Sequence, residues 1–393
     1  MAPPSPVPAN SAILLSPGTL LQLLRDGEPH TRAELAATTG MSRSTISARV
    51  DALRDLDLVR PYGDGRSTGG RPPAQFIFNP SSRMVLGIDL GAAHVAVGLA
   101  DLAGEIIASH REPFDLSAGP AEFVAWVQRE GDALLRSTGT SRDALLGVGL
   151  GVPGPVDASG RLISPFLMPG WEKYPLAEEL TAHFGAPVTM DNDVNVRAMA
   201  EHRIGWPQVD NLLFVKAATG IGSGIVAGGQ VQRGALGAAG DLGHFIADPE
   251  SDVVCRCGNR GCLEAIASAS ALAGRFVGDD PGAVDRLIDL ARSGDSRIGA
   301  GVREAARHIG AVLGSAVSLL NPSVVILGGR LASAGEPFLA GVRETIYQQA
   351  VPLATRDLVV VESRLREMGG VRGASLLSID AALSSEAIDE RVD

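Results

Sequence analysis

The chain has 393 residues, a net charge of −11, 45% hydrophobic residues and 20% charged residues. This composition excludes a predominantly disordered chain, and the negative charge excludes a protein that binds nucleic acid over its whole surface. No apolar run reaches the ~18 residues of a membrane span, and no signal-peptide pattern is present, so we expect a cytoplasmic protein without membrane partners.

The first 80 residues carry the signals of a winged helix. Residues 1–15 have four prolines among the first eight, so we expect a disordered tail there. Residues 17–59 predict three helices: Thr31 and Glu34 form a capping-box pattern at the start of the second, which Gly40 ends, and Ser42 can cap the third. A turn-rich ribbon over 62–73 and strand-like residues 75–78 complete a winged helix-turn-helix domain over 16–80.

This segment is the expected DNA-binding region. Residues 1–80 hold eight arginines against seven acidic residues, while the rest of the chain is strongly acidic. The second helix of a helix-turn-helix enters the major groove with its N-terminus first, so Ile46 and Val50 should face the core. The predicted DNA-binding residues are Ser42, Arg43, Ser44, Thr45, Ser47 and Arg49, with Arg66 and Arg71 of the ribbon acting as a wing. The alternative is a small helical subdomain that docks on the rest of the protein.

From Met84 onward, short apolar strands alternate with helices, which is typical of the α/β class. The predicted helix lies near 120–136, and the predicted strands are 85–90, 95–99, 106–110, 146–152, 188–190, 212–215, 225–226 and 324–327. Two glycine-rich turns that follow strands, near Asp89 and Thr219, fit two related lobes but do not prove them.

A histidine and all three cysteines of the chain form a metal-binding pattern. The three cysteines lie within eight residues, and an odd, clustered set is a poor disulfide framework. One imidazole and three thiolates make a closed tetrahedral site, which predicts structural Zn²⁺. The expected ligands are His244, Cys255, Cys257 and Cys262; the alternative is a set of buried free thiols.

Residues 218–229, 233–244 and 255–264 resemble the signature strings of the ROK family, which contains repressors, open reading frames and sugar kinases. The resemblance covers about residues 16–385, and the fused helix-turn-helix is similar to the repressor branch. It implies an actin-like, ribonuclease-H-like fold over 81–393, with a sugar held between two lobes. Lobe one would span about 84–190 plus a C-terminal helix, and lobe two about 191–370.

The resemblance also implies a set of sugar-binding residues. A sugar site needs carboxylates and amides that bind hydroxyl groups, and the family's residues map here to Gly154, Asn192, Asp193, Asp241, His244 and Glu264. In the kinases of the family, the residue at Asp193 takes a proton from the acceptor hydroxyl. From the residues alone, a helix N-cap is the alternative role for Asp193.

Three departures from the kinase pattern bear on function. The family's usual glutamate is replaced by Asp241, and residues 164–171 lack the asparagine that kinases have there. At the first strand turn, Ala92 adds a methyl group and Ala93 removes a hydroxyl near the nucleotide phosphates. The remaining, vestigial nucleotide residues are Asp89, Gly91, Gly220 and Gly222. We therefore predict that ATP and Mg²⁺ are not used.

The leading hypothesis is a sugar-responsive transcription repressor with a kinase-like effector domain. Because one recognition helix reads only a few base pairs, we expect a homodimer or homotetramer on an inverted repeat of operator DNA. The alternative is an ATP-dependent sugar kinase that carries a DNA-binding module. A third hypothesis, a regulator controlled by a protein partner without any sugar, is disfavoured by the retained sugar-site residues.

Overall fold

The computed structural model describes residues 16–64, 73–163 and 168–392. The predicted disordered tail, residues 1–15, therefore lies outside the described residues. Contacts within the chain divide it into two units. Unit 1 comprises residues up to Met84, Asp101–Glu105 and the residues from Ile379 onward, and unit 2 comprises Val85–Ala100 and Ile106–Ser378. No helix of the described residues is both long and apolar enough to cross a membrane.

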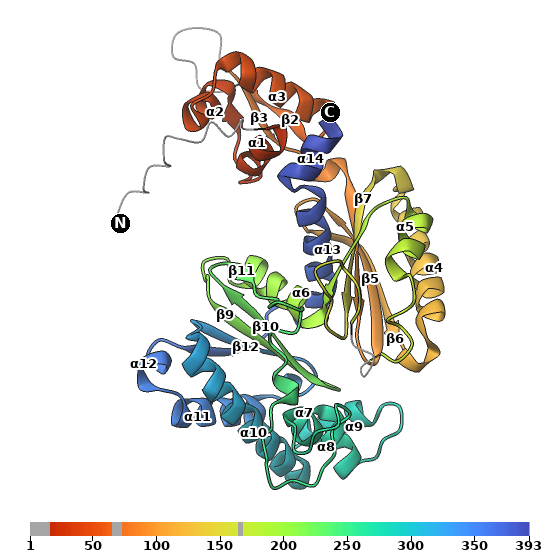
Figure 1. The fold of residues 1–393 in the computed structure, drawn as a ribbon, viewed down its shortest axis with the longest axis vertical. Helices are drawn as coiled ribbons and strands as arrows, with labels where there is room; N and C mark the ends of the chain where they lie inside the picture. Colours follow the sequence, from red (N-terminus) through yellow and green to blue (C-terminus); the bar gives the residue numbers. More distant parts are fainter. Residues whose placement is uncertain (1–15, 65–72, 164–167, 393) are drawn as a thin grey trace. The chain divides into compact units, whose positions relative to one another are not determined.

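Unit 1 contains a winged helix (Figure 1), as the sequence predicted. Its sheet has the strand order β1-β3-β2, and its elements are α1 (Pro17–Leu24), β1 (His30–Thr31), α2 (Arg32–Thr39), α3 (Arg43–Asp55), β2 (Val59–Asp64) and β3 (Ala74–Phe78). The predicted capping box of Thr31 and Glu34 is confirmed. The third helix ends before residue 59 because Asp57 has a positive φ of 61°, which stops an α-helix.

A segment from the far end of the sequence completes unit 1. Helix α14 (Ser385–Val392) packs on α1, where the Gly18 N–H donates to Asp389 Oδ1 at 2.8 Å. A Cβ atom on Gly18 would lie 2.2 Å from the backbone oxygen of Ser385, so only glycine permits this approach. A C-terminal helix was expected from the sequence for lobe one. The described chain ends in two helices, α13 (Gly369–Ala382) and α14, of which α14 belongs to unit 1.

Unit 2 consists of two lobes, each with a five-stranded sheet, which confirms the predicted fold class (Figure 1). Lobe one has the order β6-β5-β4-β7-β8, and lobe two has β11-β10-β9-β12-β13. In both sheets the first strand lies at the centre, with the second and third on one side and the fourth and fifth on the other. This shared order supports the expectation of two related lobes.

The strands of lobe one are β4 (Met84–Leu90), β5 (His94–Asp101), β6 (Ile106–Pro113), β7 (Leu145–Val152) and β8 (Val188–Asn192), with helices α4 (Pro120–Thr138) and α5 (Leu176–Phe184). Lobe two contains β9 (Leu212–Ala217), β10 (Ile221–Ala227), β11 (Gln230–Val231), β12 (Val324–Gly328) and β13 (Val359–Glu362). Its helices are α7 (Leu263–Ala267), α8 (Ala269–Phe276), α9 (Ala283–Arg292), α10 (Ser296–Leu320), α11 (Glu336–Gln349) and α12 (Pro352–Thr355).

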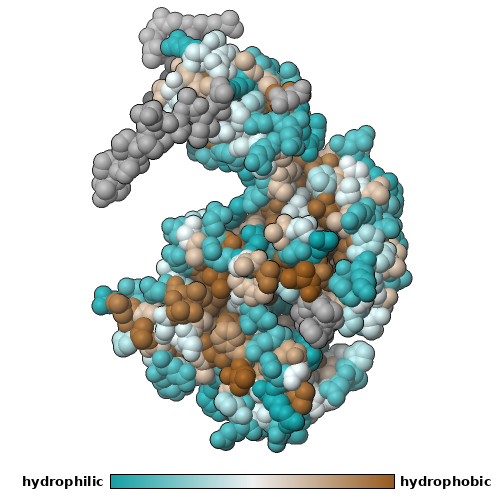
Figure 2. Space-filling view, in the orientation of Figure 1, coloured by the Kyte–Doolittle hydropathy of each residue, from teal (hydrophilic) through white to brown (hydrophobic). Residues whose placement is uncertain are grey.

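The part of the chain that the structure describes also contains seven shorter helical segments: η1 (Pro80–Ser82), η2 (Leu116–Ala118), η3 (Arg142–Ala144), the π-helical η4 (Glu201–Gly205), η5 (Leu242–His244), η6 (Ala332–Ala334) and η7 (Arg366–Met368). The core of lobe two lies between its sheet and the long helices α10 and α11. Figure 2 shows apolar side chains gathered on the surface of lobe two around α12, and exposed apolar residues of this region are Leu319, Tyr347, Val351 and Leu353.

Helix α6 (Asp193–Ala200) connects the site to both lobes. Every residue of α6 is buried. Ala198 packs against the strands of lobe two, whereas Val196, Met199 and Ala200 pack against Leu376 and Leu377 of α13. A helix buried on all sides has little freedom to shift, so α6 fixes the residues at its N-terminus.

Candidate functional site

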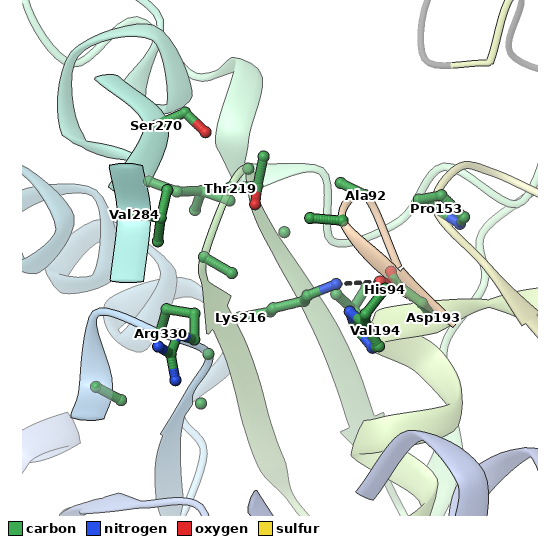
Figure 3. Close-up of a pocket in the computed structure, with 18 of the residues that line it drawn as sticks. Ala92, His94, Pro153, Asp193, Val194, Lys216, Thr219, Ser270, Val284 and Arg330 are labelled. Carbon is green, nitrogen blue, oxygen red and sulfur yellow. Dashed lines mark hydrogen bonds and ion pairs between the residues drawn. The ribbon is translucent and has the colours of Figure 1, made fainter. Parts of the chain in front are cut away.

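A cavity of about 1940 Å³ lies between the two lobes (Figure 3). Residues from both lobes line it, among them Ala92 and His94 from lobe one and Lys216 and Thr219 from lobe two. The structure brings all six predicted sugar-site residues to its wall: Gly154, Asn192, Asp193, Asp241, His244 and Glu264. Their role in sugar binding stays a prediction, but the chain does fold so that they share one space.

Asn192 and Asp193 lie where β8 ends and α6 begins. Asn192 Oδ1 accepts the Val194 N–H at 2.9 Å, so the N-cap is Asn192 and not Asp193. Asp193 Oδ2 accepts a hydrogen bond from Lys216 Nζ of β9, and the two side chains face each other across the cavity wall (Figure 3). This pair was not predicted from the sequence, although a lysine inside the apolar strand 212–217 was a usable signal.

Asp191, the residue before Asn192, makes hydrogen bonds that hold neighbouring segments of the cavity wall in place. Its side chain is almost fully buried, and Oδ2 accepts a hydrogen bond from Arg233 Nε at 2.7 Å. Oδ1 accepts the Asn192 N–H at 2.7 Å and Asn195 Nδ2 at 2.9 Å. Because Arg233 begins the loop that carries Asp241, this ion pair holds that loop against the end of β8.

In the predicted phosphate region, Asp89 is paired with the protein's own side chains. Asp89 is fully buried, and its Oδ2 lies 2.5 Å from Arg197 Nη2 and 3.1 Å from His94 Nε2. Burial would raise the pKa of Asp89, but the Arg197 guanidinium and the His94 hydrogen bond outweigh burial and hold that pKa well below its usual range. A Cβ atom on Gly91 would lie 2.2 Å from the His94 ring, so the imidazole covers the turn.

The two glycines of the second turn have packing reasons to be glycine. A Cβ atom on Gly220 would lie 2.4 Å from Glu264 Oε2, and one on Gly222 would lie 3.2 Å from the Val194 side chain. Glu264 Oε2 accepts the Ile221 N–H at 2.9 Å, which holds the carboxylate beneath this turn. The presence of Gly220 and Gly222 is therefore no argument for a bound nucleotide.

The predicted metal ligands converge. The ligand atoms of His244, Cys255, Cys257 and Cys262 all lie within 4.8 Å of one another. A tight turn after Cys255 helps to make this possible: the Gly258 N–H donates to the Cys255 oxygen at 2.9 Å, and Gly258 has a φ of 94°. The cluster is consistent with a zinc site, because tetrahedral coordination at ~2.3 Å per sulfur brings ligand atoms about this close together.

The chemistry of the thiols also fits a bound cation. Burial is the main cause that raises the pKa of the Cys262 thiol to about 12, and neighbouring thiols add to it. Burial likewise raises the pKa of Cys255, whereas hydrogen bonds outweigh burial and lower that of Cys257. A divalent cation stabilises thiolates and so removes the conflict among three adjacent sulfurs.

The DNA-binding residues predicted for α3 lie at its first turns. Ser42 is the N-cap: its Oγ accepts the Thr45 N–H at 3.1 Å, so this hydroxyl already holds the helix. Ile46 and Val50 are buried, as predicted. Ser42, Arg43 and Ser44 are exposed, and Thr45, Ser47 and Arg49 are partly exposed. The predicted wing residues, Arg66 and Arg71, lie outside the described residues.

A winged helix fused to a two-lobed domain of this topology defines a transcription regulator with a kinase-like domain. Residues 16–67 match the model of the MarR family, and residues 85–381 match that of the ROK family. The chain belongs to the ROK family. The match spans both lobes, and the MarR match covers the helix-turn-helix.

Known proteins agree with this assignment. A putative xylose repressor of Caldicellulosiruptor sp. is 30% identical, over 93% of this chain and 95% of its own length. A crystal structure of a ROK transcriptional regulator, a homologue of the E. coli MLC protein, has a TM-score of 0.77 at 24% identity and covers 96% of this chain and 98% of its own. A ROK glucokinase from Streptomyces griseus, solved with glucose and AMPPNP, has a TM-score of 0.63 at 28% identity over 75% of this chain and 98% of its own.

The cysteine cluster generates the first prediction. Elemental analysis of the purified protein should find about one zinc per chain, and Cys257→Ser should lose the metal and unfold at a lower temperature, because site formation and folding are coupled. Val253→Ser, at an exposed position of the same loop, serves as the control and should keep the metal. A metal-free wild-type protein of unchanged stability would contradict the assignment.

The Asp89–Arg197 pair generates a second prediction, on pH. Since the folded-state pKa of Asp89 lies below its unfolded value, its ionisation stabilises the fold above about pH 4 and this contribution fades as the pH falls further. Asp89→Asn should lower the free energy of unfolding by roughly 3–5 kcal/mol at pH 7, because Arg197 loses its buried partner.

Denaturant titrations at several pH values check this. The difference between wild type and Asp89→Asn should shrink below pH 4, whereas the fully exposed Asp252 should tolerate Asp252→Asn within about 0.5 kcal/mol. A difference that is independent of pH would show that the ionised carboxylate is not the stabilising species.

Proposed function

We propose that this protein is a sugar-responsive repressor. The winged helix over residues 16–80 binds operator DNA, and the ROK domain over 81–393 binds a small-molecule sugar between its lobes. The bound sugar favours one arrangement of the lobes, and that arrangement releases the operator. The proposal places the protein in the bacterial cytoplasm, where it meets both DNA and sugar.

The observation that carries this proposal is the meeting of six predicted residues in one cavity. Asn192 and Asp193 reach the cavity from the start of α6, Asp241 and His244 from the loop before the cysteine cluster, and Glu264 from the start of α7. Carboxylate and amide oxygens from opposite walls are what sugar hydroxyls require. The similarity to a protein named a xylose repressor makes D-xylose the first sugar to test.

Two basic side chains that pair with carboxylates of the site support ligand binding rather than catalysis. In a kinase, the carboxylate at Asp193 must be able to take a proton from the substrate hydroxyl, but here Lys216 donates a hydrogen bond to it. Asp89, which a kinase would offer near the phosphates, is paired with Arg197. We therefore propose that ATP and Mg²⁺ have no role. The similarity to a glucokinase keeps the kinase alternative worth one direct experiment.

We propose that the cysteine cluster holds a structural Zn²⁺ through His244, Cys255, Cys257 and Cys262. A bound zinc would fix the loop between β11 and α7, and this loop presents Asp241 and His244 to the cavity. We further propose a homodimer or homotetramer on an inverted repeat. The exposed apolar residues around α12 support association, since patches of this kind are common sites of protein–protein contact.

Sugar-controlled DNA binding is the third prediction. Arg43→Ala should weaken binding to the DNA upstream of the protein's own gene by ~1–3 kcal/mol, the range of one good base contact. A fluorescence titration with and without D-xylose, D-glucose or N-acetyl-D-glucosamine should show one sugar that weakens operator binding roughly 5–150-fold.

Two controls make this test sharp. Arg54→Ala, in the last turn of α3 and paired with Asp51, should leave operator affinity nearly unchanged. Asn192→Ala should keep operator binding but lose the response to sugar. A sugar that binds tightly in the cavity and leaves operator affinity unchanged would refute the sensor mechanism.

Absent phosphoryl transfer is the fourth prediction. A coupled assay with ATP, Mg²⁺ and each of the three sugars should give no sugar-dependent ADP, since Lys216 and Arg197 occupy the carboxylates that the reaction needs. Asp193→Asn distinguishes the two sources of any ADP that forms: activity of this protein should be lost in the variant, whereas activity of a contaminating kinase should remain. Turnover that needs both the sugar and Asp193 would favour the kinase alternative.

A further inference from the structure

Arg256 lies between two of the cysteines of the cluster, and its side chain nevertheless lines the cavity. No role for Arg256 was predicted from the sequence. Its neighbours Cys255 and Cys257 hold the backbone on both sides of it, so a metal bound to these two residues would also fix the origin of the arginine side chain. The guanidinium is therefore presented to the cavity from a rigid base.

Most of the guanidinium is used to hold Glu264. Arg256 Nε lies 2.9 Å and Nη2 lies 2.6 Å from Glu264 Oε1. The other carboxylate oxygen, Oε2, accepts the Ile221 N–H at 2.9 Å. Both oxygens of Glu264 thus have fixed donors, and the carboxylate is held in one orientation at the cavity wall.

The arrangement leaves donor capacity on Arg256. Its side chain is 47% exposed, whereas that of Glu264 is 11% exposed. Nη1 has no hydrogen-bond partner among residues 16–64, 73–163 and 168–392. A guanidinium has five N–H donors in a fixed plane, so holding Glu264 leaves further donors for an oxygen in the cavity.

We propose that Arg256 is a ligand-binding residue of the sugar site: Nε and Nη2 orient Glu264, and Nη1 donates to an oxygen of the bound sugar. This inference rests on the proposed function, because it assumes that a sugar occupies the cavity. It adds a donor to a site whose other predicted members are mostly acceptors. A sugar oxygen that only accepts, such as a ring or carbonyl oxygen, or a hydroxyl that also donates to Glu264, meets this requirement.

The chain offers a matched control. Arg260 lies in the same loop between Cys257 and Cys262, but it is 61% exposed, pairs with Asp252 and does not line the cavity. Arg256→Gln and Arg260→Gln thus remove the same charge from the same loop. Only the first removes a group from the cavity.

The experiment measures sugar affinity by isothermal titration with the full-length protein and the three sugars named above. For the sugar that binds the wild type, Arg256→Gln should weaken binding about 10- to 100-fold, the value of a hydrogen bond from a charged donor. Arg256→Lys keeps the positive charge but lacks the planar set of guanidinium donors, so it should lose less sugar affinity. Arg260→Gln should bind sugar as tightly as the wild type. All variants should retain one metal ion per chain, which excludes loss of the metal as the cause.

A deoxy-sugar series distinguishes direct contact from a purely structural role. For one position, removal of the sugar oxygen should weaken binding to the wild type about tenfold or more, yet change binding to Arg256→Gln very little, because the partner is already gone. If every deoxy sugar loses the same factor in both proteins, Arg256 does not touch the sugar and the proposal is wrong.

The outcomes separate the two proposals. If a sugar binds the wild type and Arg256→Gln binds it equally well with its metal retained, the role of Arg256 is refuted and the proposed function stands. If none of the three sugars binds the wild type in this cavity, the proposed function fails for these sugars and the role of Arg256 fails with it.

Discussion

The structure depends on how helix α6 and the π-helical segment η4, which continues it, bury three ionisable side chains on one face. Asp193, Arg197 and Glu201 follow one another at intervals of four residues, and all three are buried. Each has a partner in a different part of unit 2: Lys216 of β9, Asp89 of β4, and Ser363 together with the Leu365 N–H after β13. A buried charge without a partner costs several kcal/mol, so α6 has a single permitted register. That register fixes which side chains of the two lobes meet at the cavity.

Members of this family share a scaffold, and the proposed difference between enzyme and sensor lies in the cation that neutralises its carboxylates. In a kinase, Mg²⁺ enters the site bound to the nucleotide and leaves with it after the reaction. Lys216 and Arg197 belong to the chain, so the carboxylates with which they pair in this structure need no added cation. A site built in this way selects a ligand by shape and hydrogen bonding. In the proposed sensor, no reaction would remove the ligand, so its occupancy can be reported to another part of the molecule.

The sequence predicted local features better than long-range pairs. The capping box at Thr31, the strand positions and the cysteine cluster depend on residues close in sequence, where spacing alone carries the information. The six cavity residues came from resemblance to a family, and the structure brings them together. The ion pair of Asp89 and Arg197 joins residues 108 positions apart, and no periodicity indicates it. Arg256 was passed over because it lies among metal ligands, where loop residues are usually solvent-exposed. The packing of α14 on α1 was missed for the same long-range reason.

That last contact has a consequence for how the protein is made. Gly18 and its partner Asp389 are 371 residues apart, so at ~5–20 residues per second the ribosome needs roughly 20–75 s to supply the second after the first. Throughout this time, the surface of α1 that α14 covers stays without its partner. The residues of unit 2, which end at Ser378, have been synthesised before the winged helix can gain this supporting helix. A growing chain therefore carries an unsupported α1 until α14 has been translated, and the winged helix is completed only after the residues of both lobes have been made.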